Sequence, residues 1–458
     1  MSEIPIYYES RLVGRIHVRA EGPSFAYSPD WLQTKGAFPI SVRMPLTHRP
    51  IDPHEFLSWA ANLLPEAAHL RAVSLKLGAS PEDVIGILSE IGRDTAGALS
   101  IGLPGTTSPG GWRPIPNDDD LERIIDELPN KPFLVGEDGV SMSLAGAQSK
   151  LGVAVNKRGE LCIPVDGAPS TYILKPDAKD RLFGSVQNEA MCMVLARLCG
   201  LNAPQVTTGK AGSRTYFLVK RYDRIQDGER WRRLHQEDYC QALGRPPSAK
   251  YQNNQSGIPG PSLSEMFAVT RNVTQARDVM SLLDYVIFNI ATCNTDAHAK
   301  NYSLMLSGRG AALAPIYDVL CADAWPNVTK NLAQRVGDKS RGAHLKKRHW
   351  ERMAVECGLR PAGVVARVRD FVRQMRANLS SAAAEVSGMP AGPHVMMSAF
   401  ESAIEERGKL LLLGLEEEGA VVTKPPSRKT PMAAPKKRAT KKPAPQTQTA
   451  PKSPRRRR

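Results

Sequence analysis

The sequence predicts an α+β fold of two lobes, in which a β-rich lobe precedes a mainly helical one. Residues 1–46 and 133–225 are dominated by short alternating apolar runs punctuated by Pro and Gly, which is the pattern of strands. Residues 231–405 instead carry apolar side chains mostly at helical spacing. At the C-terminal end, Val421–Arg458 is rich in Pro, Lys, Ala and Thr and has almost no apolar bulk, so we expect a disordered tail over residues 419–458.

Composition argues against several classes of protein. The 458 residues and the apolar content of 41% suffice for two to three domains with a core. No apolar run reaches the ~18 residues of a membrane-spanning helix, and the N-terminus lacks the basic and apolar regions of a signal peptide. The seven cysteines are scattered without a C-x-x-C pair, and no H-E-x-x-H or G-x-S-x-G motif is present. We therefore expect a cytoplasmic protein with buried thiols.

The net charge of +15 is concentrated in the tail. Val421–Arg458 holds 13 Lys or Arg and no Asp or Glu, so residues 1–420 carry 48 basic and 46 acidic residues, a net charge of +2. The part of the chain that is expected to fold is therefore nearly neutral, and any attraction to nucleic-acid phosphates belongs to the tail.

Residues 1–105 are predicted to form a first subdomain. We expect strands at Ile4–Tyr8, Val13–Val18 and Ser24–Tyr27, helices at Glu55–Leu64, Pro65–Leu77 and Val84–Glu90, and a return to strand over Ile91–Ser100. The next segment, Thr106–Asn117, is rich in Gly and Pro and is expected to be a connection.

Residues 106–225 are predicted to form a β-rich lobe with few helices. We expect an acidic helix at Asp118–Leu128, strands at Leu151–Val155, Tyr172–Lys175 and Tyr216–Lys220, and a helix at Ser185–Leu198 that Gly200 ends.

Two features of this lobe are suited to binding phosphate. Ala145, Gly146 and Ala147 are small, which lets backbone N–H groups approach a ligand closely, as a loop that binds phosphate requires. Lys175 ends a strand, where its ammonium could reach the α- and β-phosphates of ATP, and Glu189 on the following helix could orient it. The alternative is an ordinary hairpin turn, a solvated lysine and a surface glutamate.

Residues 226–418 are predicted to form the helical lobe, which contains one polar loop. Ser281–Thr292 predicts a buried helix that leads into Thr295–Asn301. After the loop, we expect a hairpin with strands at Tyr302–Leu306 and Ala311–Ile316 around the turn Ser307–Gly310.

The loop and the end of the hairpin offer three oxygen-bearing side chains, Asp296, Asn301 and Asp318. Asp296 and Asn301 are five residues apart, which is the D-x-x-x-x-N spacing of a protein-kinase catalytic loop. Phosphoryl transfer from ATP needs a base for a hydroxyl proton and oxygen ligands for Mg²⁺, and these residues could supply both. The alternative is that Asp296 and Asn301 only cap turns.

Seven motifs then identify a family by their order along the chain. They are Ser143–Gln148, Tyr172–Pro176, Asn188-Glu189, Val219–Arg224, His235–Cys240, Thr295–Asn301 and Tyr317-Asp318. In this order the chain resembles HipA-type toxins, the serine/threonine kinases of bacterial toxin–antitoxin pairs, and Asn62–Pro65 and Ile91–Gly97 resemble the N-terminal subdomain of that family. The resemblance spans about residues 1–400 and implies a bilobal protein-kinase-like fold whose β-rich N-lobe carries an extra N-terminal subdomain.

The resemblance implies a role for each residue of the catalytic centre. Asp296 would be the catalytic base, Asn301 and Asp318 would hold Mg²⁺, and Lys175 would contact the phosphates of ATP under the loop Ala145–Gln148.

The resemblance also implies roles outside that centre. Lys220 and Tyr222 match the segment whose backbone meets adenine, and Ser143 matches a serine that such kinases autophosphorylate. A phosphate on Ser143 adds about 1.5 to 2 negative charges beside those of ATP and would inactivate the enzyme. The run Gln236–Asp238 matches a recurrent motif whose role cannot be derived from the residues; the alternative is that it caps a helix and hydrogen-bonds towards the catalytic loop.

The family further implies cofactors and partners. These are ATP and Mg²⁺, a small helix-turn-helix antitoxin of the HipB type that binds kinase and operator DNA, and a serine of an aminoacyl-tRNA synthetase as the substrate whose phosphorylation arrests translation. Two other functions stay open. One is a small-molecule kinase acting on lipids or aminoglycosides, and the other is a nucleic-acid-associated regulator whose basic tail binds DNA weakly without sequence preference.

Overall fold

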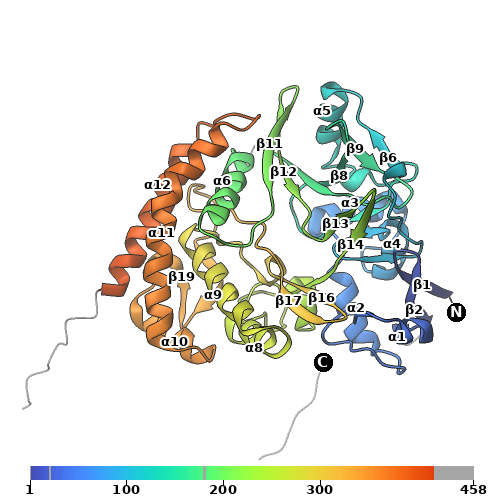
Figure 1. Cartoon of the computed structure of the whole chain (residues 1–458), viewed down its shortest axis with the longest axis horizontal. Coiled ribbons are helices and arrows are strands. Elements are labelled where there is room, and N and C mark those ends of the chain that lie inside the picture. The colour runs from blue at the N-terminus through green and yellow to red at the C-terminus, as the bar shows by residue number, and fades with distance from the viewer. Residues whose placement is uncertain (1, 20–21, 179–181, 417–458) are drawn as a thin grey trace, which may run out of the picture. The chain divides into compact units, whose positions relative to one another are not determined.

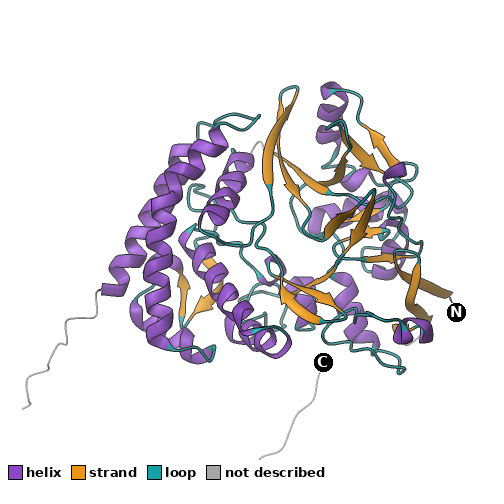
Figure 2. Cartoon of the chain, viewed as in Figure 1, coloured by secondary structure: helices purple, strands orange, loops and turns teal. Residues whose placement is uncertain are grey.

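The computed structural model describes residues 2–19, 22–178 and 182–416 (Figure 1). Residues 1–418 form one compact unit, and the tail predicted to be disordered lies outside the described residues. Within that unit, the long helices gather on one side and most strands on the other, where shorter helices lie among them, as Figure 2 shows. No helix among the described residues has the length and apolar content needed to cross a membrane. The predicted domain boundaries at residues 105 and 225 stay predictions.

The N-terminal subdomain is a four-stranded antiparallel sheet covered by helices. Its strands have the order β3-β2-β1-β5, with bounds β1 Ser2–Tyr8, β2 Arg11–Arg19, β3 Gly22–Tyr27 and β5 Leu99–Ile101. Its helices are α1 Pro29–Gln33, α2 Pro53–Ala61, α3 Ala67–Leu77 and α4 Val84–Ile91. The core is aromatic, and Phe25 and Phe56 stack at 5.5 Å between ring centroids.

Three of the predicted strands and all three predicted helices of this subdomain are confirmed, with shifted ends. The fourth predicted strand, Ile91–Ser100, is wrong as a single strand: Ile91 ends α4, and the segment forms the two short strands β4 Asp94–Thr95 and β5 Leu99–Ile101. Helix α2 begins two residues early because the Asp52 carboxylate accepts a hydrogen bond from the backbone N–H of His54 and Pro53 occupies the first turn. Helix α3 begins at Ala67 because Pro65 is drawn into a β-bridge with Gly146, a residue of the predicted phosphate loop.

The β-rich lobe is built on a six-stranded antiparallel sheet of order β11-β12-β10-β8-β9-β6. The strands are β6 Trp112–Pro114, β8 Leu151–Val155, β9 Leu161–Pro164, β10 Tyr172–Pro176, β11 Val206–Ala211 and β12 Arg214–Lys220, and the helices are α5 Asp118–Glu127 and α6 Ser185–Leu198. The three predicted strands and both helices are confirmed. Strand β6 lies in the segment that was expected to be a connection. It is an edge strand of the sheet, and a proline such as Pro114 is tolerated at a sheet edge.

The helical lobe packs around the buried helix α9 and the long helix α11. Its helices are α7 Tyr239–Ala242, α8 Leu263–Val273, α9 Ala276–Ala291, α10 Lys347–Glu356, α11 Pro361–Ser387 and α12 Met397–Glu416. Helices α11 and α12 lie side by side, and α11 also packs on α6 of the other lobe (Figure 1). The predicted helix that leads into the polar loop is confirmed as α9, which starts five residues earlier than expected.

The helical lobe contains more strands than the sequence predicted. The expected hairpin is present as β16 Ser303–Ser307 and β17 Gly310–Leu313, but β15 His235–Asp238 joins it as a third strand. Two further antiparallel pairs are β13 Arg224–Asp227 with β14 Arg230–Arg233 and β18 Asn331–Val336 with β19 Lys339–Arg341. Outside the helical lobe, β4 Asp94–Thr95 and β7 Met142–Ser143 form a parallel pair. The run of β15 is polar throughout and does not alternate, so its strand state depends on backbone pairing with β16.

Short 3₁₀ turns complete the chain at Pro109–Gly111, Pro132–Leu134, Pro247–Ala249, Ala299–Asn301 and Gly342–His344. The fourth of these turns ends the polar loop that follows α9.

A buried ion cluster fixes the N-terminal subdomain to the segment between the lobes. Asp94 Oδ1 lies 2.7 Å from Arg224, Asp223 Oδ2 lies 2.7 Å from Arg221, and the backbone N–H of Gly97 donates to Asp223 at 2.8 Å. Burial disfavours the ionised carboxyl, yet the surrounding arginines hold the pKa of Asp94 well below its usual range. Removing one partner would leave a buried unpaired charge, so the cluster sets how these segments meet.

Candidate active site

The predicted site residues line one cavity of about 1130 Å³ between the β-rich and helical lobes. Ten of the eleven residues that the sequence selected border it: Ala145, Gly146, Ala147, Gln148, Lys175, Lys220, Tyr222, Asp296, Asn301 and Asp318. The exception is Ser143, which does not border the cavity.

Lys175 of the β-rich lobe lines this cavity and forms an ion pair with a carboxylate of the helical lobe. Its ammonium is 2.7 Å from Glu189 Oε1 on α6 and 2.5 Å from Asp318 Oδ1, which follows the hairpin. Burial works against its charge, but the two carboxylates raise the pKa of Lys175, so the ammonium stays protonated. Burial likewise opposes ionisation of Asp318, whose pKa Lys175 and Lys150 nevertheless hold below its usual range. Burial raises the pKa of Glu189 to about 7.

The loop after α9 presents a single exposed carboxylate. Residues 291–301 are buried except for Asp296, which faces open space. The turn is fixed by Asn294, whose Oδ1 accepts from the backbone N–H of Asp296 at 3.1 Å, and by Asn301, whose amide donates to the Asp296 carbonyl at 2.8 Å. Partial desolvation of the carboxyl inside the cavity raises the pKa of Asp296. This arrangement suits a base that has to reach a substrate.

Tyr251 contacts the candidate base and was not predicted from the sequence. Its hydroxyl donates a hydrogen bond to Asp296 Oδ1, and its ring meets His298 edge-on at 5.1 Å. This bond works against the effect of burial by favouring the ionised carboxylate. The preceding residue, Lys250, forms an ion pair with Glu66 of the N-terminal subdomain. No local spacing links residue 251 to residue 296, so no sequence pattern marks Tyr251.

The predicted phosphate loop adopts a backbone conformation that favours glycine. Gly146 has φ of +111°, and a Cβ there would lie 2.5 Å from Lys150 Nζ. The Lys150 ammonium donates to the Ala145 carbonyl at 2.6 Å, and the Gly146 carbonyl accepts from the backbone N–H of Glu66 at 3.2 Å. The loop is therefore held from both sides.

Lys150 is a second cation that the sequence analysis missed. It is buried, borders the cavity and lies near Lys175, and burial together with that neighbour lowers its pKa to about 8. Its position three residues after Ala147, the last small residue of the loop, is the pattern that could have indicated it.

Ser143 lies in β7 and is fully buried. Its hydroxyl donates to the carbonyl of Leu63 at 2.7 Å, so it faces the N-terminal subdomain. In this conformation the predicted phosphorylation site is not presented to Asp296.

The predicted adenine segment lines the cavity along the end of β12. The backbone N–H groups of Lys220 and Arg221 donate to the carbonyls of Gln205 and Thr171, each at 2.9 Å. The Tyr222 hydroxyl donates to Gln236 Oε1. These bonds fix the segment at the edge of the cavity.

The candidate metal ligands are few. Among the described residues, no group of three or more His, Cys, Asp or Glu could by itself hold a metal ion. Asp318 and Asn301 supply a carboxylate and an amide oxygen, a set that fits Mg²⁺ only when phosphate oxygens and water complete the coordination.

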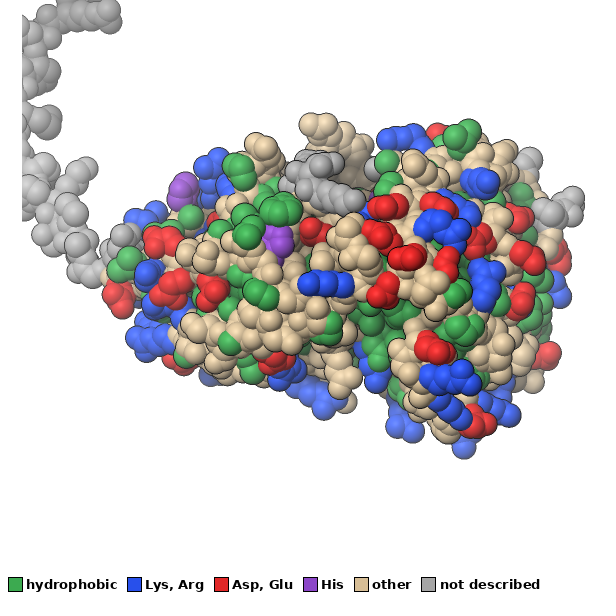
Figure 3. Space-filling model, turned by 90° about the horizontal axis from the view of Figure 1, so that it is seen from above, with side chains coloured by type: hydrophobic (Ala, Val, Ile, Leu, Met, Phe, Trp, Pro, Cys, Tyr) green, Lys and Arg blue, Asp and Glu red, His purple; other side chains and the backbone are tan. Residues whose placement is uncertain are grey.

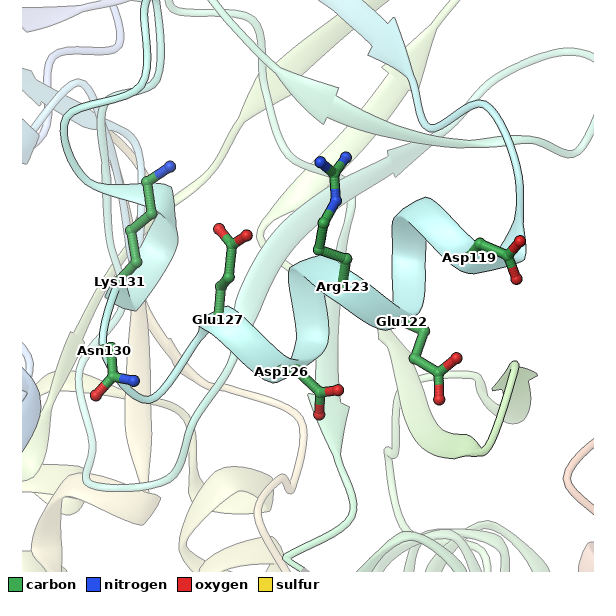
Figure 4. A pocket seen from close by; sticks show the side chains of 7 residues that line it. All are labelled: Asp119, Glu122, Arg123, Asp126, Glu127, Asn130 and Lys131. Atoms are coloured by element: carbon green, nitrogen blue, oxygen red, sulfur yellow. The ribbon is translucent and has the colours of Figure 1, made fainter.

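A second hollow, of about 480 Å³, lies on helix α5 and is lined by four acids, two cations and Asn130. Figure 4 shows that these side chains radiate from the helix instead of converging. Two of the acids have structural partners: Glu122 accepts from the backbone N–H of Ser213 at 2.9 Å, and Asp126 pairs with Arg214. We assign this hollow no chemistry.

On the face shown in Figure 3, basic and acidic side chains of the described residues are interspersed. This agrees with the net charge of +2 for residues 1–420.

Comparisons with known families match most of the chain. The family model of the HipA N-terminal domain matches residues 4–102, and the model of the HipA-like C-terminal domain matches residues 142–379.

Individual relatives agree with the family models. The putative kinase Y4mE of Sinorhizobium fredii is 36% identical over 378 residues, which cover 80% of this chain and 88% of that protein. The serine/threonine-protein kinase toxin HipA of Shewanella oneidensis is 31% identical over 343 residues, covering 72% of this chain and 77% of that protein. Among solved structures, HipA of Shewanella oneidensis MR-1, in complex with HipB and operator DNA, superposes with a TM-score of 0.77 at 24% identity, covering 90% of this chain and 98% of that one.

The first prediction tests the phosphate loop. Gly146→Ala should lower the affinity for ATP at least about tenfold, because it adds a Cβ at positive φ against the Lys150 ammonium. Isothermal calorimetry with a non-hydrolysable ATP analogue measures the change. The matched control is Gly159→Ala, which has a φ of +80° but open space around the added Cβ. Equal ATP affinity of the two variants would contradict the assignment of the loop.

The second prediction concerns pH. Because the pKa of Lys150 is lowered to about 8, its ammonium loses its proton as pH rises through that value, and the affinity for ATP should fall between about pH 7.5 and pH 9. The Lys150→Met variant should bind ATP more weakly at pH 7.5 and show no such pH dependence. A flat profile for the unaltered chain would show that Lys150 does not contact the phosphates.

Proposed function

The chain belongs to the HipA family of serine/threonine kinase toxins, and from this premise we propose that its inter-lobe cavity binds ATP and that Asp296 directs the γ-phosphoryl group to a serine of a protein. One observation carries the proposal: Lys175, Asp318, Asn301 and Asp296 border the same cavity, although they come from both lobes. A protein kinase needs these groups together, since its catalysis depends on positioning and on stabilising charge.

The phosphates of ATP would lie under the loop Ala145–Gln148. Lys175, already oriented by Glu189, would contact their oxygens, and Lys150 would add a second positive charge. The serine hydroxyl would approach Asp296, which accepts its proton as the oxygen attacks the γ-phosphorus and ADP leaves. The bond from Tyr251 helps to keep Asp296 ionised and therefore able to act as a base.

Mg²⁺ fits the residues present. Asn301 donates its amide to the backbone, which leaves its Oδ1 as the atom able to bind a cation, and Asp318 is kept ionised by Lys175. When bound, Mg²⁺ would neutralise charge on the β- and γ-phosphates. Adenine would lie along Lys220–Tyr222, which also line the cavity.

The proposed partners follow the relatives. The solved HipA structure contains HipB and operator DNA, which supports a helix-turn-helix antitoxin of that type for this chain. A serine of an aminoacyl-tRNA synthetase is the proposed substrate, with arrest of translation as the result. Transfer to lipid or aminoglycoside acceptors is the alternative that a substrate panel tests. DNA binding through the basic tail and the cytoplasmic location both stay predictions.

Autophosphorylation of Ser143 is proposed as the inactivating step. The serine is buried against the N-terminal subdomain, so the segment around it has to leave its place before Asp296 could reach the hydroxyl. The doubly charged phosphate could not return to that apolar position without a large desolvation cost, which would keep the phosphate loop displaced.

The third prediction tests the base. Asp296→Asn should reduce the transfer of label from γ-labelled ATP to proteins of a bacterial lysate by about 10²- to 10⁴-fold, because the amide cannot accept a proton. ATP affinity should stay within about twofold, since Asp296 does not contact the phosphates in the proposed complex, and the growth arrest caused by expression should disappear. A variant that still arrests growth and labels proteins would refute the role of Asp296.

The fourth prediction tests the modification. Ser143→Ala should eliminate the autophosphorylated species in mass spectra, and phosphorylation of the unaltered chain should accelerate hydrogen exchange over residues 141–150. Ser141→Ala is the matched control, because its hydroxyl also donates to a backbone carbonyl, that of Glu90, at 2.7 Å. Phosphate found on another residue, or retained in Ser143→Ala, would contradict the assignment.

A further inference from the structure

The strand β15 carries three consecutive side chains that bond to three different parts of the molecule. Gln236 accepts from the Tyr222 hydroxyl beside the proposed adenine segment. Glu237 accepts from the backbone N–H of Val42 in the N-terminal subdomain at 2.8 Å. Asp238 accepts from the Lys300 ammonium in the catalytic loop at 2.7 Å. The polar run Gln236–Asp238 therefore lies where the predicted adenine segment, the N-terminal subdomain and the catalytic loop meet. Asp238 also caps α7, so the alternative role of helix capping with a hydrogen bond towards the catalytic loop is confirmed.

The Lys300 ammonium is fully coordinated. A lysine has three N–H donors, and here they meet Asp238 Oδ2 at 2.7 Å and both the carbonyl and the Oδ1 of Asn62 at 2.9 Å. The Lys300 side chain is 3% exposed. A buried charge with all its donors satisfied has one favourable position, so these three acceptors fix where Lys300 lies.

Lys300 in turn fixes the groups that do the chemistry. It directly precedes Asn301, whose amide holds the Asp296 carbonyl at 2.8 Å. The carbonyl of Lys300 accepts from the Tyr317 hydroxyl at 2.7 Å, and Tyr317 directly precedes Asp318. The candidate base and metal ligands are thus connected through Lys300, whose three donors bond to Asn62 and Asp238.

The acceptor Asn62 belongs to the N-terminal subdomain and is rigidly held. It caps the C-terminal end of α2, and its own amide donates to the carbonyls of Ser58 at 2.8 Å and Arg245 at 2.9 Å. The subdomain also packs directly on β15, where a Cβ on Gly97 would lie 3.0 Å from the backbone nitrogen of Gln236.

We propose that Lys300 is a positioning residue through which the N-terminal subdomain holds the catalytic loop in its active geometry. The contact of Asn62 and Asp238 with the Lys300 ammonium makes that subdomain a part of the kinase centre. The inference rests on the proposed roles of Asp296 and Asn301. Misplacing reacting groups by about 1 Å can cost up to about 100-fold in rate, so loss of this contact should appear in the chemical step.

A double-mutant cycle on the full chain tests the proposal. Single-turnover transfer of label from γ-labelled ATP to lysate proteins, measured across ATP concentrations, separates the maximal rate from the apparent KM for ATP. Asn62→Ala and Lys300→Met should each lower the maximal rate at least about tenfold and change the KM less than about threefold. The double variant should be no slower than the slower single variant, because both changes remove the hydrogen bond between the Lys300 ammonium and Asn62 Oδ1.

The matched control is Asp83→Ala, which removes the cap of α4 inside the same subdomain, where Asp83 accepts from the backbone N–H of Gly86 at 2.9 Å. It should lower the unfolding midpoint while leaving the maximal rate unchanged well below that midpoint. If Lys300→Met does not fold, the comparison of Asn62→Ala with Asp83→Ala decides alone.

Three outcomes would overturn the inference: unchanged rates in Asn62→Ala, additive losses in the double variant, or equal losses in Asp83→Ala. Asp296→Asn separates this inference from the proposed function. If Asp296→Asn is inactive and Asn62→Ala is fully active, only the positioning role fails, whereas an active Asp296→Asn removes the premise itself.

Discussion

The ammonium of Lys175 is the constraint around which the two lobes are arranged. It is buried, and a buried charge is tolerated only when it is paired. Its partners, Glu189 and Asp318, come from a helix of the β-rich lobe and from the segment after the catalytic hairpin. Pairing the Lys175 ammonium with both carboxylates therefore brings together the end of β10, helix α6 and the candidate metal ligand Asp318. The inter-lobe cavity lies beside these groups, since Lys175, Glu189 and Asp318 all line it.

Two further buried polar networks attach the N-terminal subdomain to this centre. Asp94 meets the arginines that follow β12, and Asn62 meets Lys300 in the catalytic loop. Buried ion pairs contribute little net stability, since desolvation offsets most of the attraction, but they strongly penalise any arrangement that leaves a charge unpaired. Their effect in this chain is geometric. They specify how three segments that are far apart in the sequence must meet.

The predicted phosphate loop, Ala145–Gln148, is held by residues outside it. Gly146 needs a positive φ, the Lys150 ammonium holds the carbonyl of Ala145, and Glu66 of the N-terminal subdomain holds the carbonyl of Gly146. The neighbouring Ser143 is buried against the same subdomain. A loop that depends on a separate subdomain for its position can be displaced as a unit, and this would couple ATP binding to modification of that serine.

The sequence by itself indicated the two-lobed α+β organisation and the motifs that carry the predicted site. Alternation and helical spacing indicated about half of the described strands and helices, and the five-residue spacing of Asp296 and Asn301 predicted a catalytic loop, because local patterns depend on neighbours along the chain. Only the tertiary structure decided which distant groups meet: Tyr251 on the base, Asp238 and Asn62 on Lys300, and the pairing of β15 with the hairpin. Such contacts join residues separated by tens to hundreds of positions, so no periodicity records them. They form because packing places each buried donor beside an acceptor, and a buried donor without a hydrogen-bond partner is energetically unfavourable.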